Sequence, residues 1–256
     1  MADAHASDVR WIWAFLDRPA TEFDRAARFW AHASGTALSP RRGEDGRFAT
    51  FLPARGDAFV KIQGVIEGGG AHLDFEVADL AAAADRALAL GATPVLREPG
   101  LEVLRSPAGQ SFCLTDWAGQ GQWPPAATTP SGALTRVDQV CLDIDPDAFA
   151  EESAFWSGLT GWSVTPTGAP EFSRLHTPAH LPVRILLQRR DEPGPAAAHI
   201  DVACSDVAAV RAWHEELGAR HVRDGRHWTV MRDPAGSLYC LTPRSPETGL
   251  LPPART

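Results

Sequence analysis

The chain has 256 residues, of which 44% are hydrophobic and 22% charged, so it is long enough to form two domains with substantial cores. Its formal net charge is −8 and no cluster of lysines and arginines stands out in the sequence, which argues against a nucleic-acid partner, because a phosphate backbone requires a concentrated positive patch. We expect a cytoplasmic protein with no membrane partner, because no apolar run reaches transmembrane length and the first residues contain no apolar signal segment. The four cysteines show no C-x-x-C spacing, so we expect reduced thiols in strands.

Apolar runs and turn residues in the first half predict a strand, a helix and two strands, followed by a second strand, helix and pair of strands. In chain order these elements are expected at residues 11–16, 22–34, 48–52, 58–63, 72–77, 80–90, 101–105 and 111–115. We expect Thr21 and Asp79 to cap the two helices, and Gly91 to end the second one.

The second half repeats this order of elements. The expected ranges are 137–144, 146–159, 172–176, 183–189, 199–203, 207–217, 228–232 and 238–242, with Asp206 as a helix cap. Short segments also return in matching order at one fixed offset, since His72 corresponds to His199 and Cys113 to Cys240. A fixed offset indicates a duplicated unit.

The duplication predicts an α+β protein of four βαβββ modules paired into two tandem domains. The domains are expected at residues 9–117 and 134–244. Residues 118–133 are rich in Gly, Pro, Ser and Thr, which is typical of a linker, and residues 245–256 form a Pro-rich tail.

Two pairs of motifs resemble those of the vicinal oxygen chelate (VOC) superfamily, which includes glyoxalases, bleomycin-resistance proteins and extradiol dioxygenases. They are His72-Leu73-Asp74-Phe75 with its repeat from His199, and Pro107-Ala108-Gly109 before Phe112-Cys113-Leu114 with its repeat from Pro234. More narrowly, they are similar to a glyoxalase-like branch common in actinobacteria. The resemblance covers nearly the whole chain and implies cup-shaped sheets in which His or Gln, Glu, His and Glu hold a divalent metal.

For the second half, the resemblance together with strand alternation places Gln139, His199 and Cys240 at three of the four ligand positions. The remaining position falls on Leu186 or Gln188. Both family glutamates are missing. Nitrogen and sulfur donors suit zinc best among divalent ions, so zinc is the first candidate metal.

In the first half the same positions fall on Trp13, Lys61, His72 and Cys113. An indole and a cationic amine oppose a divalent ion, so this half departs further from the metal pattern of the superfamily. The resemblance makes the cysteines a feature of the branch rather than evidence for a thiol nucleophile.

Each motif histidine is followed two residues later by an aspartate on the same strand face. The pairs His199 with Asp201 and His72 with Asp74 are therefore candidate catalytic groups, in which the carboxylate fixes the tautomer of a basic imidazole. A structural pair in the wall of the cup has the same sequence pattern, so both interpretations stay open.

Two functional hypotheses follow. The first is a protein that binds a small, aromatic or planar molecule in a Trp-lined cup with a degenerate metal site; the second is a divalent-metal enzyme (lyase, isomerase or dioxygenase) acting on a small oxygenated metabolite in the second domain. A carboxylate beside His199 favours the enzyme. The expected ligand-binding residues are Trp11, Trp13, His72, Asp74, Cys113, Gln139, His199, Asp201, Trp228 and Cys240. Whether the chain forms a homodimer stays open.

Overall fold

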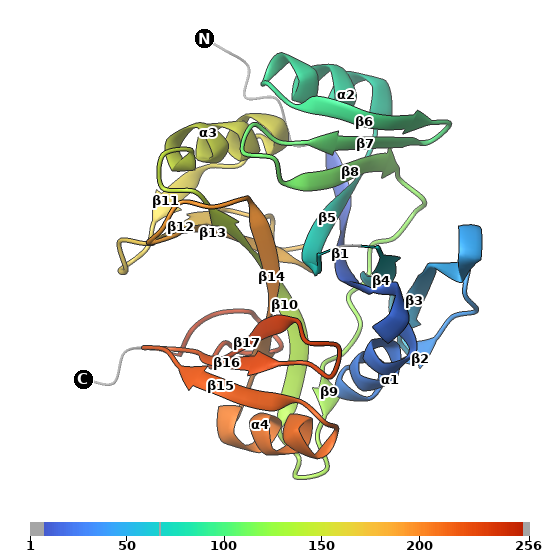
Figure 1. Ribbon diagram of the computed structural model, residues 1–256, viewed down its shortest axis with the longest axis vertical. Coiled ribbons are helices and arrows are strands. Elements are labelled where there is room, and N and C mark those ends of the chain that lie inside the picture. The colour runs from blue at the N-terminus through green and yellow to red at the C-terminus, as the bar shows by residue number, and fades with distance from the viewer. Residues whose placement is uncertain (1–7, 67, 253–256) are drawn as a thin grey trace. The chain divides into compact units, whose positions relative to one another are not determined.

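The computed structural model describes residues 8–66 and 68–252, which form two sheets, one from each half of the sequence (Figure 1). The first sheet has the order β2-β3-β4-β1-β5-β8-β7-β6 and the second the order β11-β12-β13-β10-β14-β17-β16-β15, with β9 paired to β10. The matched orders confirm the predicted α+β class and the tandem duplication.

The strands and helices of the first half are β1 (Val9–Pro19), η1 (Ala20–Glu22), α1 (Phe23–Ala33), β2 (Ala37–Leu38), η2 (Glu44–Gly46), β3 (Phe48–Leu52), β4 (Val60–Val65), β5 (Gly70–Val77), α2 (Leu80–Ala89), β6 (Thr93–Glu98), β7 (Leu101–Arg105) and β8 (Ser111–Asp116). Those of the second half are β9 (Ala127–Thr128), β10 (Leu134–Ile144), α3 (Phe149–Thr160), β11 (Val164–Pro166), β12 (Phe172–Leu175), β13 (Arg184–Arg189), β14 (Ala197–Cys204), α4 (Val207–Glu216), β15 (Arg220–Asp224), β16 (Thr229–Arg232) and β17 (Leu238–Thr242). No helix among these is long and apolar enough to cross a membrane.

The chain divides into two compact units, each of which takes modules from both halves. Unit 1 contains the described part of Met1–Ala14 with His72–Gly121 and Val140–Ala198. Unit 2 contains Phe15–Ala71, Gln122–Gln139 and the described part of His199–Thr256. Each unit therefore contains residues that are far apart in the sequence.

The core of unit 1 lies where β5 and β8 pack against α3. Phe112 contacts Trp156 edge-on at 5.2 Å between ring centroids, and Phe75 lies 5.9 Å from the same indole. α2 also packs on β7 and β8 (Figure 1). Since Phe75 and Phe112 face the helix, the alternate residues His72, Asp74 and Cys113 lie on the opposite face of the sheet, as predicted.

The core of unit 2 joins α1 to α4 and β17 through aromatic rings. Trp30 and Tyr239 lie 4.9 Å apart between centroids, and Phe29 contacts the ring of His214 at 5.5 Å. All four side chains are buried. Because these residues come from both ends of the sequence, unit 2 depends on long-range packing.

Most predicted helix ends are confirmed. The Asp79 side chain accepts the backbone N–H of Ala82, the Asp206 side chain does the same for Ala209, and Gly91 has a φ of 97° beyond the end of α2. The prediction for Thr21 is wrong. Thr21 lies within η1, and this turn leads directly into α1, whose Phe23 N–H bonds the carbonyl of Ala20 instead of a side chain.

The sequence patterns missed the outer strands β6 and β15. Every residue of β6 is exposed and β15 is almost entirely exposed, so neither strand shows the apolar alternation that marks a buried face. Trp228 was expected within a strand, but β16 begins one residue later at Thr229, and Trp228 lies in the turn that follows β15. The four cysteines, all in the described part of the chain, are thiols on β8, β10, β14 and β17, as predicted.

Candidate metal and ligand site

A histidine, an aspartate and a cysteine meet in unit 2. His199 and Asp201 lie two residues apart on β14, and Cys240 lies opposite Asp201 in the parallel pairing of β14 with β17. One possible ligand atom from each residue lies within 4.8 Å of the others. The His199 Nε2 is 3.6 Å from the Asp201 Oδ1. We call these three residues the C-terminal cluster.

Gln139 on β10 joins the C-terminal cluster through Asp201. Its amide Nε2 donates a hydrogen bond of 2.6 Å to the Asp201 Oδ2. Gln139, Asp201 and Cys240 are buried, whereas the His199 side chain keeps 18% of its surface exposed. The predicted metal ligands Gln139, His199 and Cys240 thus all lie around Asp201. The predicted set of metal ligands did not include this carboxylate.

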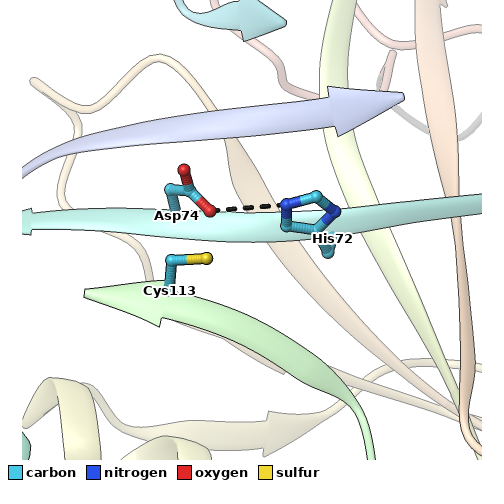
Figure 2. A group of neighbouring side chains, drawn as sticks. All are labelled: His72, Asp74 and Cys113. Carbon is cyan, nitrogen blue, oxygen red and sulfur yellow. Dashed lines mark ion pairs between the residues drawn. The ribbon is translucent and has the colours of Figure 1, made fainter. Parts of the chain in front are cut away.

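The same arrangement occurs in unit 1. Figure 2 shows His72 and Asp74 projecting from β5, with the sulfur of Cys113 on the neighbouring strand β8. The His72 Nε2 is 3.5 Å from the Asp74 Oδ1, and Cys113 pairs in register with Asp74. Possible ligand atoms of these three residues also lie within 4.8 Å of one another. We call them the N-terminal cluster.

The two clusters differ at the position occupied by Gln139 in the second half. Its counterpart Trp13 donates its indole N–H to the Glu76 Oε1 at 2.7 Å. Glu76 also accepts hydrogen bonds from the backbone N–H of Ala118 and the side chain of Gln120, both at 3.2 Å. The nearby carboxylate therefore already accepts three hydrogen bonds, and the indole offers no lone pair to a metal.

The three tryptophans predicted to bind a ligand lie in different settings. Trp11 has no exposed surface and Trp13 keeps 6%. Trp228 is half-buried, and its ring covers Gly225 so closely that an added Cβ there would lie 2.3 Å from the indole. Their role in ligand binding stays a prediction.

The remaining sequence candidates also have identified neighbours. The Lys61 Nζ lies 5.2 Å from the centroid of the Phe15 ring, which is a cation–π contact. The Cys141 thiol donates to the Gln188 Oε1 at 3.5 Å, within unit 1. The interpretation of Gln188 as a fourth metal ligand stays a prediction.

The repeated βαβββ modules, with donor side chains on the face of each sheet opposite the helices, define a protein with the VOC fold. The family model described as "Glyoxalase-like domain" matches residues 13–115 and 139–242, and the chain belongs to this family. Both matches coincide with the two sheets, so the predicted resemblance is confirmed. No curated protein matches the chain.

Solved structures share the fold over nearly the whole chain. The Mn(II)-bound glyoxalase from Novosphingobium aromaticivorans has a TM-score of 0.66 at 20% identity, covering 92% of this chain and 82% of that one. The 2,3-dioxygenase LapB from Pseudomonas sp. KL28 has a TM-score of 0.63 at 15% identity, covering 92% of each chain. For 2,2',3-trihydroxybiphenyl 1,2-dioxygenase from Sphingomonas wittichii strain RW1 the TM-score is 0.62 at 15% identity, with 93% and 90% covered. These TM-scores show a common fold, and at identities of 15–20% the activity has to be argued from the site.

Proposed function

We propose that the chain is a divalent-metal enzyme of the glyoxalase-like family that acts on a small oxygenated metabolite at the C-terminal cluster. The observation that carries this proposal is the position of Asp201. Its buried carboxylate lies 3.6 Å from the His199 imidazole, and both residues have possible ligand atoms within 4.8 Å of the Cys240 sulfur. Neither of the family's two glutamate ligand positions holds a glutamate in this chain, but the Asp201 carboxylate lies in the cluster.

The donor set of the C-terminal cluster fits a divalent ion. It offers an imidazole nitrogen, a carboxylate oxygen and a sulfur, a combination that zinc accepts more readily than magnesium or manganese. Because the Gln139 amide nitrogen donates to Asp201, its carbonyl oxygen remains as a further ligand atom. With three protein ligands, a tetrahedral zinc ion would keep its fourth coordination position for a substrate.

The residues of the cluster have separable tasks in this proposal. A bound divalent ion supplies Lewis-acid polarisation of a substrate oxygen. Asp201 orients the His199 ring and is itself held by the Gln139 amide. His199 is the most exposed of these side chains, so an ion held by its imidazole would be accessible to a substrate.

A metal-free binding protein is the second candidate function. It is favoured by the Gln139–Asp201 hydrogen bond, which stabilises the buried carboxylate without any cation. In this case the ligand is a small planar molecule that contacts indole rings.

Elemental mass spectrometry on tag-free protein separates the two candidates. We expect about one equivalent of a divalent metal per chain, lost in His199→Ala and retained in the matched variant His72→Ala. Absence of metal, together with no thermal shift on addition of zinc, manganese or iron(II), contradicts the enzyme proposal. In that event, quenching of tryptophan fluorescence by an aromatic ligand supports the second candidate.

A further inference from the structure

A groove of ≈ 760 Å³ in unit 2 is lined by α1, by the end of α4 and by the β15–β16 hairpin with the turn after it. None of the residues of the C-terminal cluster lines it. A volume in this range is typical of sites that bind a small molecule. The groove is therefore a candidate binding site separate from the metal cluster.

Basic side chains are concentrated on two walls of the groove. Arg25, Arg28 and His32 occupy one face of α1, because positions three, four and seven residues apart lie in line on a helix. Arg220 and Arg232 line the groove from the β15–β16 hairpin. This concentration contrasts with the formal net charge of −8 of the chain.

The two hairpin arginines lie directly opposite each other. Arg220 pairs with Arg232 in the antiparallel register of β15 and β16, and like charges at such positions destabilise a sheet unless an anion offsets them. One Arg232 Nη donates to the carbonyl of Gly236 at 2.7 Å. Within residues 8–66 and 68–252, no carboxylate forms an ion pair with Arg28, Arg220 or Arg232.

The lining of the groove also contains acidic and apolar residues. Asp233 is buried, and its carboxylate is held by the Arg18 Nε at 2.6 Å and the Trp30 Nε1 at 3.0 Å, so it does not neutralise the exposed arginines. Glu216 also lines the groove and is exposed, and within residues 8–66 and 68–252 it forms no ion pair with Arg28, Arg220 or Arg232. Leu217 and Pro234, which are half-buried, contribute apolar surface to the lining. A ligand that fits these walls carries a compact anionic group and an apolar part.

We propose that this groove binds a phosphorylated small molecule, with its phosphate between Arg220 and Arg232. Arg28 approaches from α1, and the organic part lies against Leu217 and Pro234. Guanidinium groups present several N–H donors in a planar fork that matches phosphate oxygens, which is why paired arginines favour this anion. The acidic net charge of the chain opposes an extended nucleic acid, whose backbone requires more positive surface than one groove provides.

Isothermal titration calorimetry with phenyl phosphate, and with phenol as the uncharged control, tests this proposal on the full chain. We expect saturable binding of phenyl phosphate that weakens by roughly tenfold or more in Arg220→Glu and in Arg28→Glu. Arg223→Glu is the matched control, because Arg223 is an exposed arginine on the same strand β15 that does not line the groove. This variant should bind phenyl phosphate as the wild type does.

Three results overturn the proposal. They are no binding of phenyl phosphate to the wild type, equal weakening in Arg223→Glu, and tighter binding of a single-stranded oligonucleotide than of phenyl phosphate. The His199→Ala variant should keep its affinity for phenyl phosphate, so that failure of the metal proposal and failure of this one are distinguishable. Loss of phenyl phosphate binding in His199→Ala would place the anion at the metal cluster and contradict the groove assignment.

Discussion

Arg18 and Asp233 form a buried ion pair although they are 215 residues apart in the chain, with 2.6 Å between the Arg18 Nε and the Asp233 Oδ2. The guanidinium also donates to the carbonyl of Gly70, and the carboxylate accepts the Trp30 indole N–H and the backbone N–H groups of Ala235 and Ser237. This network joins the first strand to the turn before the last strand within unit 2.

Replacing Asp233 by Ala should lower the free energy of unfolding by about 3–5 kcal/mol, because it leaves the buried Arg18 charge uncompensated. Urea denaturation followed by fluorescence measures this change. Glu215→Ala serves as the control, since its ion pair with Arg211 is exposed and should contribute at most about 0.5 kcal/mol. Similar losses in the two variants would contradict the importance assigned to the buried network.

The buried histidine of α4 should make stability depend on pH. His214 has no exposed surface, its Nδ1 contacts the Tyr239 hydroxyl at 2.9 Å, and burial lowers its pKa to about 4. Between this value and the ordinary value of 6.5, the unfolded chain binds a proton that the folded chain does not. Stability should therefore fall by up to about 3 kcal/mol as the pH decreases from 6.5 to 4.

Thermal unfolding across this pH range, compared between the wild type and His214→Gln, checks the prediction. The variant should be less stable at neutral pH, because it disturbs the contact with Tyr239, but its stability should vary less with pH. His227→Gln, at an exposed histidine, should follow the wild type. An identical pH profile in wild type and His214→Gln would assign the acid sensitivity to other groups.

The family resemblance places Gln139 at one ligand position and Leu186 or Gln188 at another, and the contacts of the two glutamines predict different effects of their substitution. Gln139→Leu removes the donor to Asp201, so it should weaken metal affinity by roughly 10- to 100-fold. Gln188→Leu removes only the acceptor of the Cys141 thiol and should leave the affinity nearly unchanged. Competition with a chromophoric chelator measures both variants. A larger effect of Gln188→Leu would move the site away from the C-terminal cluster.

The helix caps give a further comparison. Asp79→Ala and Asp206→Ala each remove a side chain that accepts a backbone N–H, so each should cost about 1 kcal/mol of stability. Thr21→Ala should cost much less, because Thr21 lies in η1 and does not cap α1. Chemical denaturation of the three variants measures these differences, and equal losses would restore Thr21 as a cap.

The candidate site was predictable where it depends on strand alternation. His72 and Asp74 lie two residues apart, so they share a face, and Cys113 follows from the same rule on the next strand. The hydrogen bonds from Gln139 to Asp201 and from Trp13 to Glu76 were not predictable, because each joins strands whose relative register the local pattern does not specify. The exposed strands β6 and β15 were missed because they lack an apolar face.

The sequence by itself determined the duplication, the family, the order of the main helices and of the strands with a buried face, and the two His–Asp pairs. All of these depend on periodicity and on motifs that are local in the chain. The tertiary structure decided which donors surround Asp201, how Arg18 reaches Asp233, and that Arg28, Arg220 and Arg232 line one groove. These groupings arise from packing between elements that lie far apart in the sequence, where no local spacing records which side chains will meet.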